Sequence, residues 1–336
     1  MVLVTGGTGL IGSHLLYKLV KSDEHVKAIY RSEKKLEIVE KVFSYYTENP
    51  KAAIDKIEWI KSDLLDIPSL TEAFKDVTLV YHCAAFVSFE PDKYHLLRQT
   101  NIDGTANIVN LCVANNVKKL CYLSSIAAVG EPNKDGELSE TSEWNREVDN
   151  SVYAITKYGA EIEVWRGSQE GLDVVIVNPG VVLGAGIWRY GSGSIFNRIY
   201  KGNPYYTSGS IGLVDIEDVV NIMITLVESS IKNERFVLVA ENWSYKQLLQ
   251  TVAKSLNVKE PNKEVKMWQL QISWRLDWLV HKLKGRRRRF TKQLVKTLMT
   301  KKKYNNQKIK NYLHYTFKPI DKSINEVSQV FLKEVH

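Results

Sequence analysis

The chain has 336 residues, is 44% hydrophobic, and carries 46 Lys and Arg against 38 Asp and Glu, which gives a formal charge of +8. This length and apolar content are enough for one large α/β core with a smaller lobe. No run approaches the roughly 18 apolar residues of a membrane span, and Met1 leads directly into the first expected strand. We therefore expect a cytoplasmic protein without a signal peptide.

The chain opens on an apolar strand at residues 2–5 that runs directly into Gly6, Gly9 and Gly12. Glycines at these spacings permit a tight turn and let the backbone approach a pyrophosphate, while the amides of the following helix face the phosphates. A helical pattern and a second apolar strand at 26–30 follow, as a βαβ unit requires. This context favours a nucleotide-binding loop over a glycine turn that binds nothing.

Apolar strand patterns alternate with helical patterns along the first half of the chain. The strands are expected at 2–5, 26–30, 57–60, 78–82, 119–123 and 173–177, and the long connection after the second of them has helical spacing at Leu36, Val39, Val42 and Phe43. This order predicts an α/β fold with a Rossmann-type, doubly wound parallel sheet that is covered by helices on both faces.

The three cysteines lie within these apolar patterns. Cys83, Cys112 and Cys121 have no metal-type spacing. We expect small core residues, with a disulfide or a metal site as the lesser alternative.

A second group of candidate residues follows the fifth strand. Ser125 comes just after that strand, and Tyr153 and Lys157 stand four residues apart in a helical pattern, so they share one helix face. An adjacent ammonium favours a phenolate, so we expect Lys157 to lower the pKa of Tyr153. Ser125 would then hold a substrate oxygen while Tyr153 exchanges the proton. The Tyr-Lys spacing alone is common on solvated helices, but the glycine loop and the serine favour a catalytic role.

With these motifs the chain resembles the extended short-chain dehydrogenase/reductase family, also described as the NAD-dependent epimerase/dehydratase superfamily. It looks most similar to dihydroflavonol reductase-like and 3β-hydroxysteroid dehydrogenase-like members, and the resemblance spans nearly the whole length. It implies that Lys157 also binds the nicotinamide ribose, and that Ser125, with Gly130 five residues on, is the catalytic serine.

The resemblance also implies a set of cofactor contacts and a further residue of the site. Asn101 would be a structural or proton-relay residue, and Asp63 with Leu64 would touch the adenine. The cofactor contacts expected on this basis are Gly6, Gly9, Leu10, Ile11, Gly12, Asp63, Leu64, Cys83, Ala84, Ala85, Tyr153, Lys157 and Pro179.

The same resemblance implies two regions. We expect a dinucleotide-binding domain over 1–180, to which 210–240 returns, and a discontinuous substrate lobe formed by 181–209 and 241–336. Members of the family often pair through two long helices, so 101–115 and 153–168 are the segments where a homodimer is expected.

The cofactor choice depends on the end of the second strand. An NAD enzyme usually has Asp or Glu there to bond the ribose 2′-hydroxyl, whereas an arginine can pair with a 2′-phosphate. Here Arg31 follows Tyr30, so NADP(H) is favoured. If Arg31 is only a solvated cation, the cofactor is NAD(H), or either one.

The residues after Ser125 weaken one reaction class. Dehydratases of this family have Asp-Glu there, whereas this chain has Ile126 and Ala127. Aromatic residues in the candidate substrate loops favour an apolar alcohol or ketone over a nucleotide sugar. The expected substrate contacts are Phe86, Ser88, Trp188 and Tyr190.

Three functions therefore remain. The favoured one is an NADP(H)-dependent oxidoreductase that interconverts a carbonyl and a secondary alcohol. The alternatives are a nucleotide-sugar epimerase with bound NAD, and a non-catalytic NADP(H)-binding sensor or scaffold, whose expected signature is a damaged Ser, Tyr or Lys position.

The C-terminal region is strongly basic. Residues 278–320 hold 14 Lys or Arg and no Asp or Glu. Just before them, Ile272, Leu276, Leu279, Val280 and Leu283 recur on one helical face, near Trp268, Trp274 and Trp278. We favour a helix packed on the substrate lobe with its lysines in water. Peripheral membrane contact through 272–303 is the second possibility, and nucleic-acid binding is the least favoured.

Overall fold

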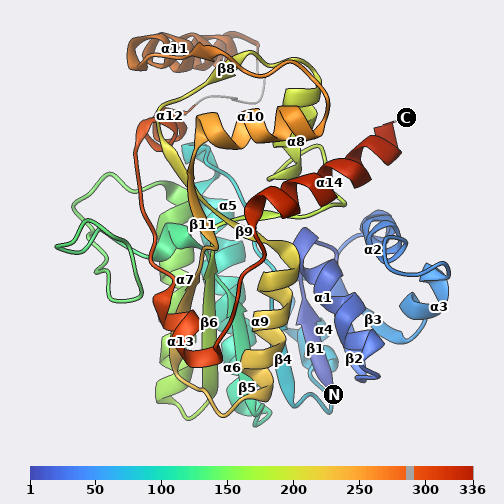
Figure 1. Cartoon of the computed structure of the whole chain (residues 1–336). Helices are drawn as coiled ribbons and strands as arrows, with labels where there is room; N and C mark the ends of the chain where they lie inside the picture. The colour runs from blue at the N-terminus through green and yellow to red at the C-terminus, as the bar shows by residue number, and fades with distance from the viewer. Residues whose placement is uncertain (285–290, 336) are drawn as a thin grey trace.

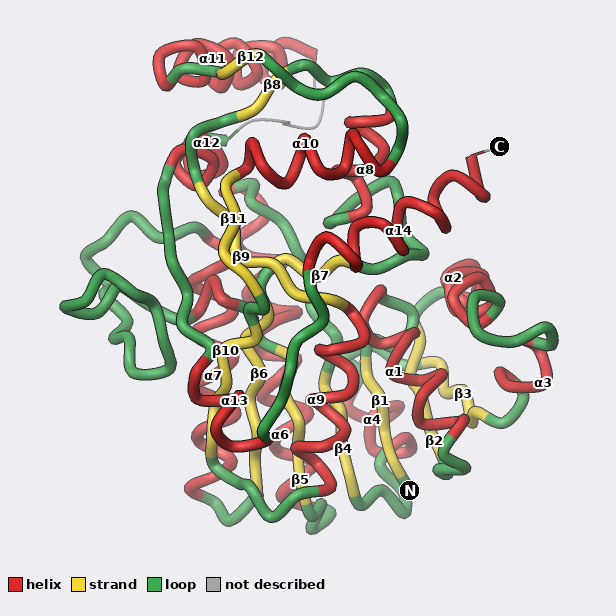
Figure 2. The backbone as a smooth tube through the Cα atoms, viewed as in Figure 1, coloured by secondary structure: helices red, strands yellow, loops and turns green. Residues whose placement is uncertain are grey.

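The computed structural model describes residues 1–284 and 291–335, and it is built around a parallel central sheet (Figures 1 and 2). The strand order in this part of the chain is β3-β2-β1-β4-β5-β6-β10. The strands are β1 Val2–Thr5, β2 Val26–Tyr30, β3 Ile57–Lys61, β4 Leu79–His82, β5 Lys119–Leu123, β6 Asp173–Pro179 and β10 Glu234–Leu238. The predicted doubly wound fold is confirmed, and β10 extends the sheet beyond the six predicted strands.

Helices cover both faces of this sheet, which is why its strands are continuous apolar runs. One face packs against α1 (Leu10–Lys21), α2 (Leu36–Phe43) and α9 (Ile216–Glu228), and the other against α4 (Ile67–Ala73), α6 (Gly104–Ala114) and α7 (Val152–Gln169). The connections also contain α3 (Pro50–Ile54) and α5 (Tyr94–Arg98). Two separate apolar layers therefore hold the sheet in place.

The strand order reverses direction at β1. The chain crosses from β1 to β2 on one side, whereas β4 lies on the other side of β1. In doubly wound sheets, ligands bind at this reversal, outside the carboxyl ends of the strands. The glycine loop, Arg31, Asp63, Cys83 and Ser125 directly follow the carboxyl ends of five neighbouring strands, β1 to β5.

A second unit lies beyond the carboxyl edge of the central sheet (Figure 1). It contains a three-stranded sheet of β7 (Val181–Leu183), β9 (Ser210–Asp215) and β11 (Glu241–Ser244), and a short pair of β8 (Tyr205–Tyr206) with β12 (Lys263–Glu264). Its helices are α8 Gly193–Tyr200, α10 Tyr245–Ser255, α11 Met267–Lys284, α12 Lys292–Met299 and α14 Ile320–Val335, while α13 Gln307–Leu313 lies beside β10.

This second unit has its own apolar cluster, which includes Phe196, Leu248, Ile324 and Phe331. Within 210–240, α9 and β10 join the central unit, whereas β9 belongs to the small sheet.

Candidate functional site

The glycine loop is shaped by close backbone contacts. Gly6 has a left-handed φ of +70°, and a Cβ there would lie 2.5 Å from the Ala84 nitrogen. A Cβ on Gly12 would lie 2.2 Å from the Gly6 oxygen, so any other residue would force the loop apart. Gly9 caps α1, so no side chain covers the amides of the first turn, which begins at Leu10 and Ile11. This backbone-lined cradle fits the pyrophosphate of a dinucleotide.

Arg31 and Asp63 meet at the ends of β2 and β3. The Nη1 of Arg31 lies 3.3 Å from Oδ2 of Asp63, and the two side chains are 54% and 43% exposed. The carboxylate of Asp63, which follows β3, therefore lies at the end of β2, where the ribose of a cofactor is expected. The sequence of β2 alone does not indicate this carboxylate. Exposed ion pairs of this kind contribute about 0–1 kcal/mol, so a stronger anion can compete for Arg31. The neighbouring Leu64 side chain is buried.

The segment after β4 is tied to β1. Thr5 Oγ1 lies 2.6 Å from Nδ1 of His82 and accepts a hydrogen bond from the Ala84 amide at 3.2 Å. Burial lowers the pKa of His82 to about 3 and raises that of the Cys83 thiol to about 12. Both groups are therefore neutral near pH 7. Cys83 and Ala84 are half-buried, Ala85 is exposed, and all three cysteines are free.

Asn101 fixes the start of the next loop. It lies in a π-helical turn, Gln99–Asp103, of a type that is frequent at functional sites. Its Oδ1 accepts from the Phe86 amide at 2.7 Å, and its Nδ2 donates to the Phe86 carbonyl at 3.0 Å and to Thr156 Oγ1 at 3.1 Å. Asn101 thus joins the loop after β4 to α7.

Tyr153 and Ser125 come together. Ser125 Oγ accepts from the Ala127 amide at 3.1 Å, and its hydroxyl lies close enough to the Tyr153 phenol to affect the pKa of that group. Tyr153 lies in the first turn of α7, and its ring packs edge-on against Phe89 with centroids 5.6 Å apart. Burial raises the pKa of Tyr153 to about 12, and Ser125 opposes this rise. The phenol is therefore protonated at neutral pH and available as a proton donor.

In place of the predicted interaction with Tyr153, Lys157 makes its hydrogen bonds to residues of β5. Its Nζ donates to Tyr122 OH at 2.6 Å and to the Leu123 carbonyl at 2.8 Å, and the side chain is 1% exposed. The expected lowering of the Tyr153 pKa by Lys157 is wrong, because burial of the phenol dominates. Burial also lowers the pKa of Lys157 to about 7, with Glu161 opposing the change. Because an ammonium has three donors, one remains for a ligand.

Glu161, which sequence reasoning missed, anchors this group. Its side chain is 1% exposed and accepts hydrogen bonds from Ser124 Oγ and, at 2.6 Å, from Asn178 Nδ2. Arg235 Nη1 on β10 lies 3.4 Å from its second oxygen. Burial raises the pKa of Glu161, while its hydrogen bonds and Arg235 oppose the shift. The available signal was its place four residues after Lys157, on the same helix face.

The neighbourhood of Glu161 also fixes Ser125. Asn178 Nδ2 donates to the Ser125 carbonyl at 2.9 Å, so β6 holds the backbone of the serine. Pro179, the next residue, ends β6 opposite Leu238.

The predicted substrate contacts lie in different surroundings. Phe86 is half-buried, and buried Ser88 accepts from the Glu90 amide at 3.2 Å. Trp188 packs against Phe196 and Phe331 in the second unit, and Tyr190 is 58% exposed. Their contacts with substrate stay predictions.

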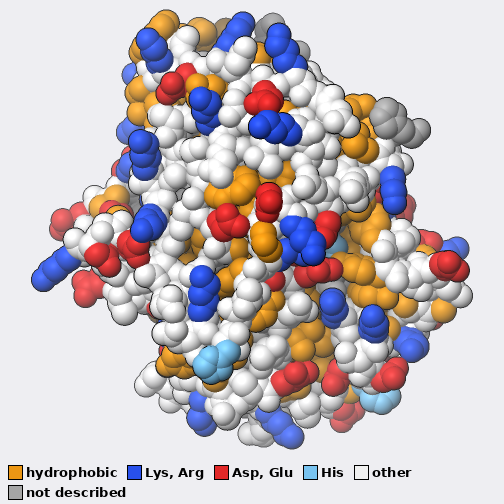
Figure 3. All heavy atoms as spheres, viewed as in Figure 1, with side chains coloured by type: hydrophobic (Ala, Val, Ile, Leu, Met, Phe, Trp, Pro, Cys, Tyr) orange, Lys and Arg blue, Asp and Glu red, His pale blue; other side chains and the backbone are white. Residues whose placement is uncertain are grey.

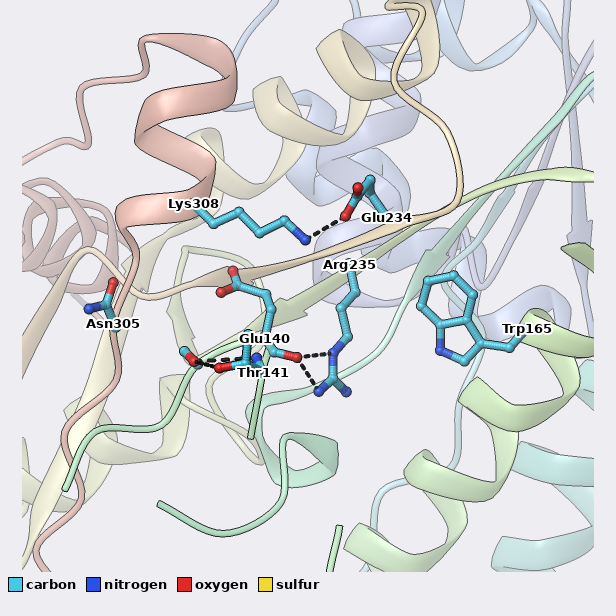
Figure 4. A pocket seen from close by; sticks show the side chains of 8 residues that line it. Glu140, Thr141, Trp165, Glu234, Arg235, Asn305 and Lys308 are labelled. Atoms are coloured by element: carbon cyan, nitrogen blue, oxygen red, sulfur yellow. Dashed lines mark hydrogen bonds and ion pairs between the residues drawn. The ribbon is translucent and has the colours of Figure 1, made fainter. Parts of the chain in front are cut away.

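A hollow at the β10 edge is lined in part by Arg235, the partner of Glu161. The two cations that line this hollow, Arg235 and Lys308, are both paired (Figure 4). Arg235 donates to the Glu140 carbonyl at 3.0 and 2.6 Å, and Lys308 lies 2.5 Å from Glu234. We assign no ligand to it. In the described chain, no group of His, Cys, Asp and Glu could hold a metal ion.

The low pKa of Lys157 makes stability depend on pH. Above pH 7 the unfolded lysine, with a pKa of 10.5, keeps a proton that the folded one has lost, so the free energy of unfolding rises with pH. Relative to Lys157→Met, wild type should therefore gain up to about 1.4 kcal/mol per pH unit between pH 7 and 10.5, with no relative change below pH 7. Urea unfolding at several pH values tests this.

The matched control is Lys254→Met on α10, an exposed lysine, whose curve should run parallel to that of wild type. Parallel curves for Lys157→Met would contradict the assigned pKa.

Comparison with known proteins adds to this geometry. The model of the NAD dependent epimerase/dehydratase family matches residues 2–239. A putative dihydroflavonol 4-reductase of Synechocystis sp. is 26% identical over 280 residues, which is 81% of this chain and 77% of that protein. Sterol demethylase protein B of Methylococcus capsulatus is 28% identical over 252 residues, 74% of this chain and 72% of that one.

The fold is shared with solved structures. UDP-glucose 4-epimerase from Thermotoga maritima, solved with UDP-glucose, superposes with a TM-score of 0.77 at 19% identity and covers 100% of this chain and 99% of that one.

Proposed function

Because this chain belongs to the NAD-dependent epimerase/dehydratase family, we propose that it is an NADP(H)-dependent oxidoreductase that interconverts a carbonyl and a secondary alcohol on a largely apolar small molecule. The observation that carries the proposal is the proximity of the Tyr153 phenol and the Ser125 hydroxyl at the carboxyl edge of the sheet, where Ser125 opposes the rise in the pKa of Tyr153. Two hydroxyls that meet in this way can bind one substrate oxygen together.

The proposed chemistry follows from the protonation states of these groups. The neutral phenol of Tyr153 donates its proton to the substrate oxygen, while Ser125 holds that oxygen in place. Lys157, with its third N–H, binds a ribose hydroxyl of the cofactor. When bound, the nicotinamide cofactor supplies or accepts the hydride. Oxidation uses the same residues in reverse.

The proposed cofactor site combines the glycine loop with the ends of the neighbouring strands. Gly6, Gly9 and Gly12 form the pyrophosphate cradle, and Leu10 and Ile11 begin the helix behind it. Arg31 binds the 2′-phosphate of NADP(H), since a dianionic phosphate attracts a guanidinium more strongly than the exposed carboxylate of Asp63 does. The remaining proposed contacts are Asp63, Leu64, Cys83, Ala84, Ala85, Tyr153, Lys157 and Pro179.

An apolar substrate is supported by the surroundings of Tyr153. Phe89 packs on its ring, and the loop of Phe86 to Phe89 is held beside it through Asn101. The names of two relatives, a dihydroflavonol reductase and a sterol demethylase protein, refer to uncharged ring systems.

A second candidate, an epimerase with bound NAD, is favoured by one observation. The Arg31–Asp63 pair occupies the guanidinium and places a carboxylate near the slot of the ribose 2′-hydroxyl. If this pair persists in the complex, NAD is the better fit.

Titration with NADPH and NADH, followed by turnover assays, tests the proposal. We expect tighter binding of NADPH, and NADPH oxidation with alicyclic or aromatic ketones. Tight NAD binding with interconversion of UDP-glucose and UDP-galactose would replace the proposal with the epimerase. Binding of NADPH without turnover of either class would favour a sensor or scaffold.

A further inference from the structure

Helix α11 lies at the far end of the second unit, away from the central sheet (Figure 1). Within residues 1–284 and 291–335, no helix is both long enough and apolar enough to cross a bilayer. The role of α11 must therefore be sought at the surface of this helix.

The outer face of α11 is apolar. Ile272, Leu276 and Leu283 are 49%, 57% and 73% exposed, and Leu276 and Leu283 are among the most exposed large apolar side chains of the described chain. At 100° per residue, six of the eight exposed large apolar residues of α11 fall within one sector of about 120°, and Met267 and Trp278 lie outside it. This outer stripe consists of Trp268, Ile272, Leu276, Leu279, Val280 and Leu283.

The opposite face of α11 attaches the helix to the protein. Leu270 is 5% exposed, Trp274 is half-buried, and the helix packs against α12. The helix therefore packs on the second unit through this side, and the outer stripe is left exposed.

Cations flank the outer stripe. Arg275 and Lys282 lie on one border, the latter with its Nζ 5.4 Å from the ring centre of Trp278, which is itself exposed. Two copies meeting through this face would bring like charges together, whereas anionic lipid headgroups would be attracted.

We propose that α11 docks on the surface of an anionic lipid bilayer, with the outer stripe below the headgroups and the flanking cations among them. Exposed tryptophans suit this interface, because their rings are amphipathic. The helix then lies parallel to the membrane plane. This proposal is independent of the reaction proposed above.

The docked helix is connected to the proposed catalytic helix. On α12, which packs against α11, Gln293 Nε2 donates to Asp149 Oδ1 at 2.6 Å and Lys296 donates to the Asp149 carbonyl at 3.3 Å. Asp149 lies four residues before Tyr153, just ahead of α7. A bilayer in contact with α11 would therefore lie on the side of the molecule where α12 contacts the segment that precedes α7.

Flotation of the full chain with vesicles tests the proposal. We expect binding to vesicles of equal parts phosphatidylcholine and phosphatidylglycerol, and little binding to phosphatidylcholine alone. Raising NaCl from about 0.1 M to about 0.5 M should weaken binding several-fold, because the Debye length shortens. Leu276→Asp should reduce binding about tenfold or more, since it places a charge in the apolar stripe.

The matched control is Ile67→Asp on α4, an apolar residue that is 44% exposed on the central unit. It should bind vesicles as wild type does. Both variants should melt at the wild-type temperature and bind NADPH normally, so loss of vesicle binding is not loss of folding.

Three outcomes would overturn the proposal. These are no binding of wild type to the anionic vesicles, equal binding to phosphatidylcholine, and unchanged binding of Leu276→Asp. A wild-type dimer in ultracentrifugation that Leu276→Asp converts to a monomer would instead assign the stripe to an interface between copies.

Discussion

Replacing Tyr153 with Phe is expected to lower kcat about 10³-fold for ketone reduction while leaving the Kd for NADPH unchanged. The substitution removes the hydroxyl that lies near Ser125 but keeps the ring that packs on Phe89. Stopped-flow and steady-state measurements would separate binding from turnover.

Tyr158→Phe provides the matched control. Tyr158 lies on the same helix, but its ring stacks on Trp144 at 4.3 Å, so its hydroxyl is outside the proposed proton path. Full turnover of Tyr153→Phe, or an equal loss in Tyr158→Phe, would show that the proton comes from another group.

Replacing Arg31 with Ala should raise the Kd for NADPH about 10–100-fold and change that for NADH little. The proposed partner of the guanidinium is the 2′-phosphate, which NADH lacks, and hydrogen-bonded charge pairs contribute about 1.5–3 kcal/mol. Fluorescence titration with each cofactor measures the ratio.

A comparable exposed ion pair at the other edge of the sheet serves as control. Lys56 Nζ lies 3.4 Å from Asp23 Oδ1, before β3 and β2 respectively. Lys56→Ala should alter neither Kd. If Arg31→Ala weakens both cofactors equally, or neither, the argument for NADP(H) fails.

Much of the fold could be predicted because the central strands are buried on both faces and read as apolar runs. The small sheets could not, since β8 and β12 have two residues each and β7 has three. Strands this short depend on tertiary contacts more than on their own residues. The edge strand β10 of the central sheet was missed as well, because Glu234 and Arg235 at its start hide the apolar run that follows.

The candidate site was predictable where spacing along the chain implies proximity in space. Tyr153 and Lys157 share a helix face, and the glycines follow one strand. The partner of Lys157 was not predictable, because Tyr122 lies 35 residues earlier on β5. The same holds for the pairing of Arg31 with Asp63, which brings together residues from two different strands.

The surface of α11 was half predictable. Its apolar periodicity was evident in the sequence. A periodic pattern shows which residues share a helix face, but it does not show whether that face points toward the protein or toward solvent. Because the helix is held through Leu270 and Trp274, the face that usually points inward points outward (Figure 3 shows the mixture of apolar and basic side chains over this end of the molecule).

The attachment of Glu161 has a consequence for how such a protein could diversify. The hydrogen bonds described above for Ser125, Lys157 and Asn101 come from the central unit, through α7, β5, β6 and the loop after β4. From the second unit, α12 contacts the segment before Tyr153 through Asp149. The other loops and helices of that unit could therefore be exchanged, with new specificity, at little cost to the proton-transfer apparatus.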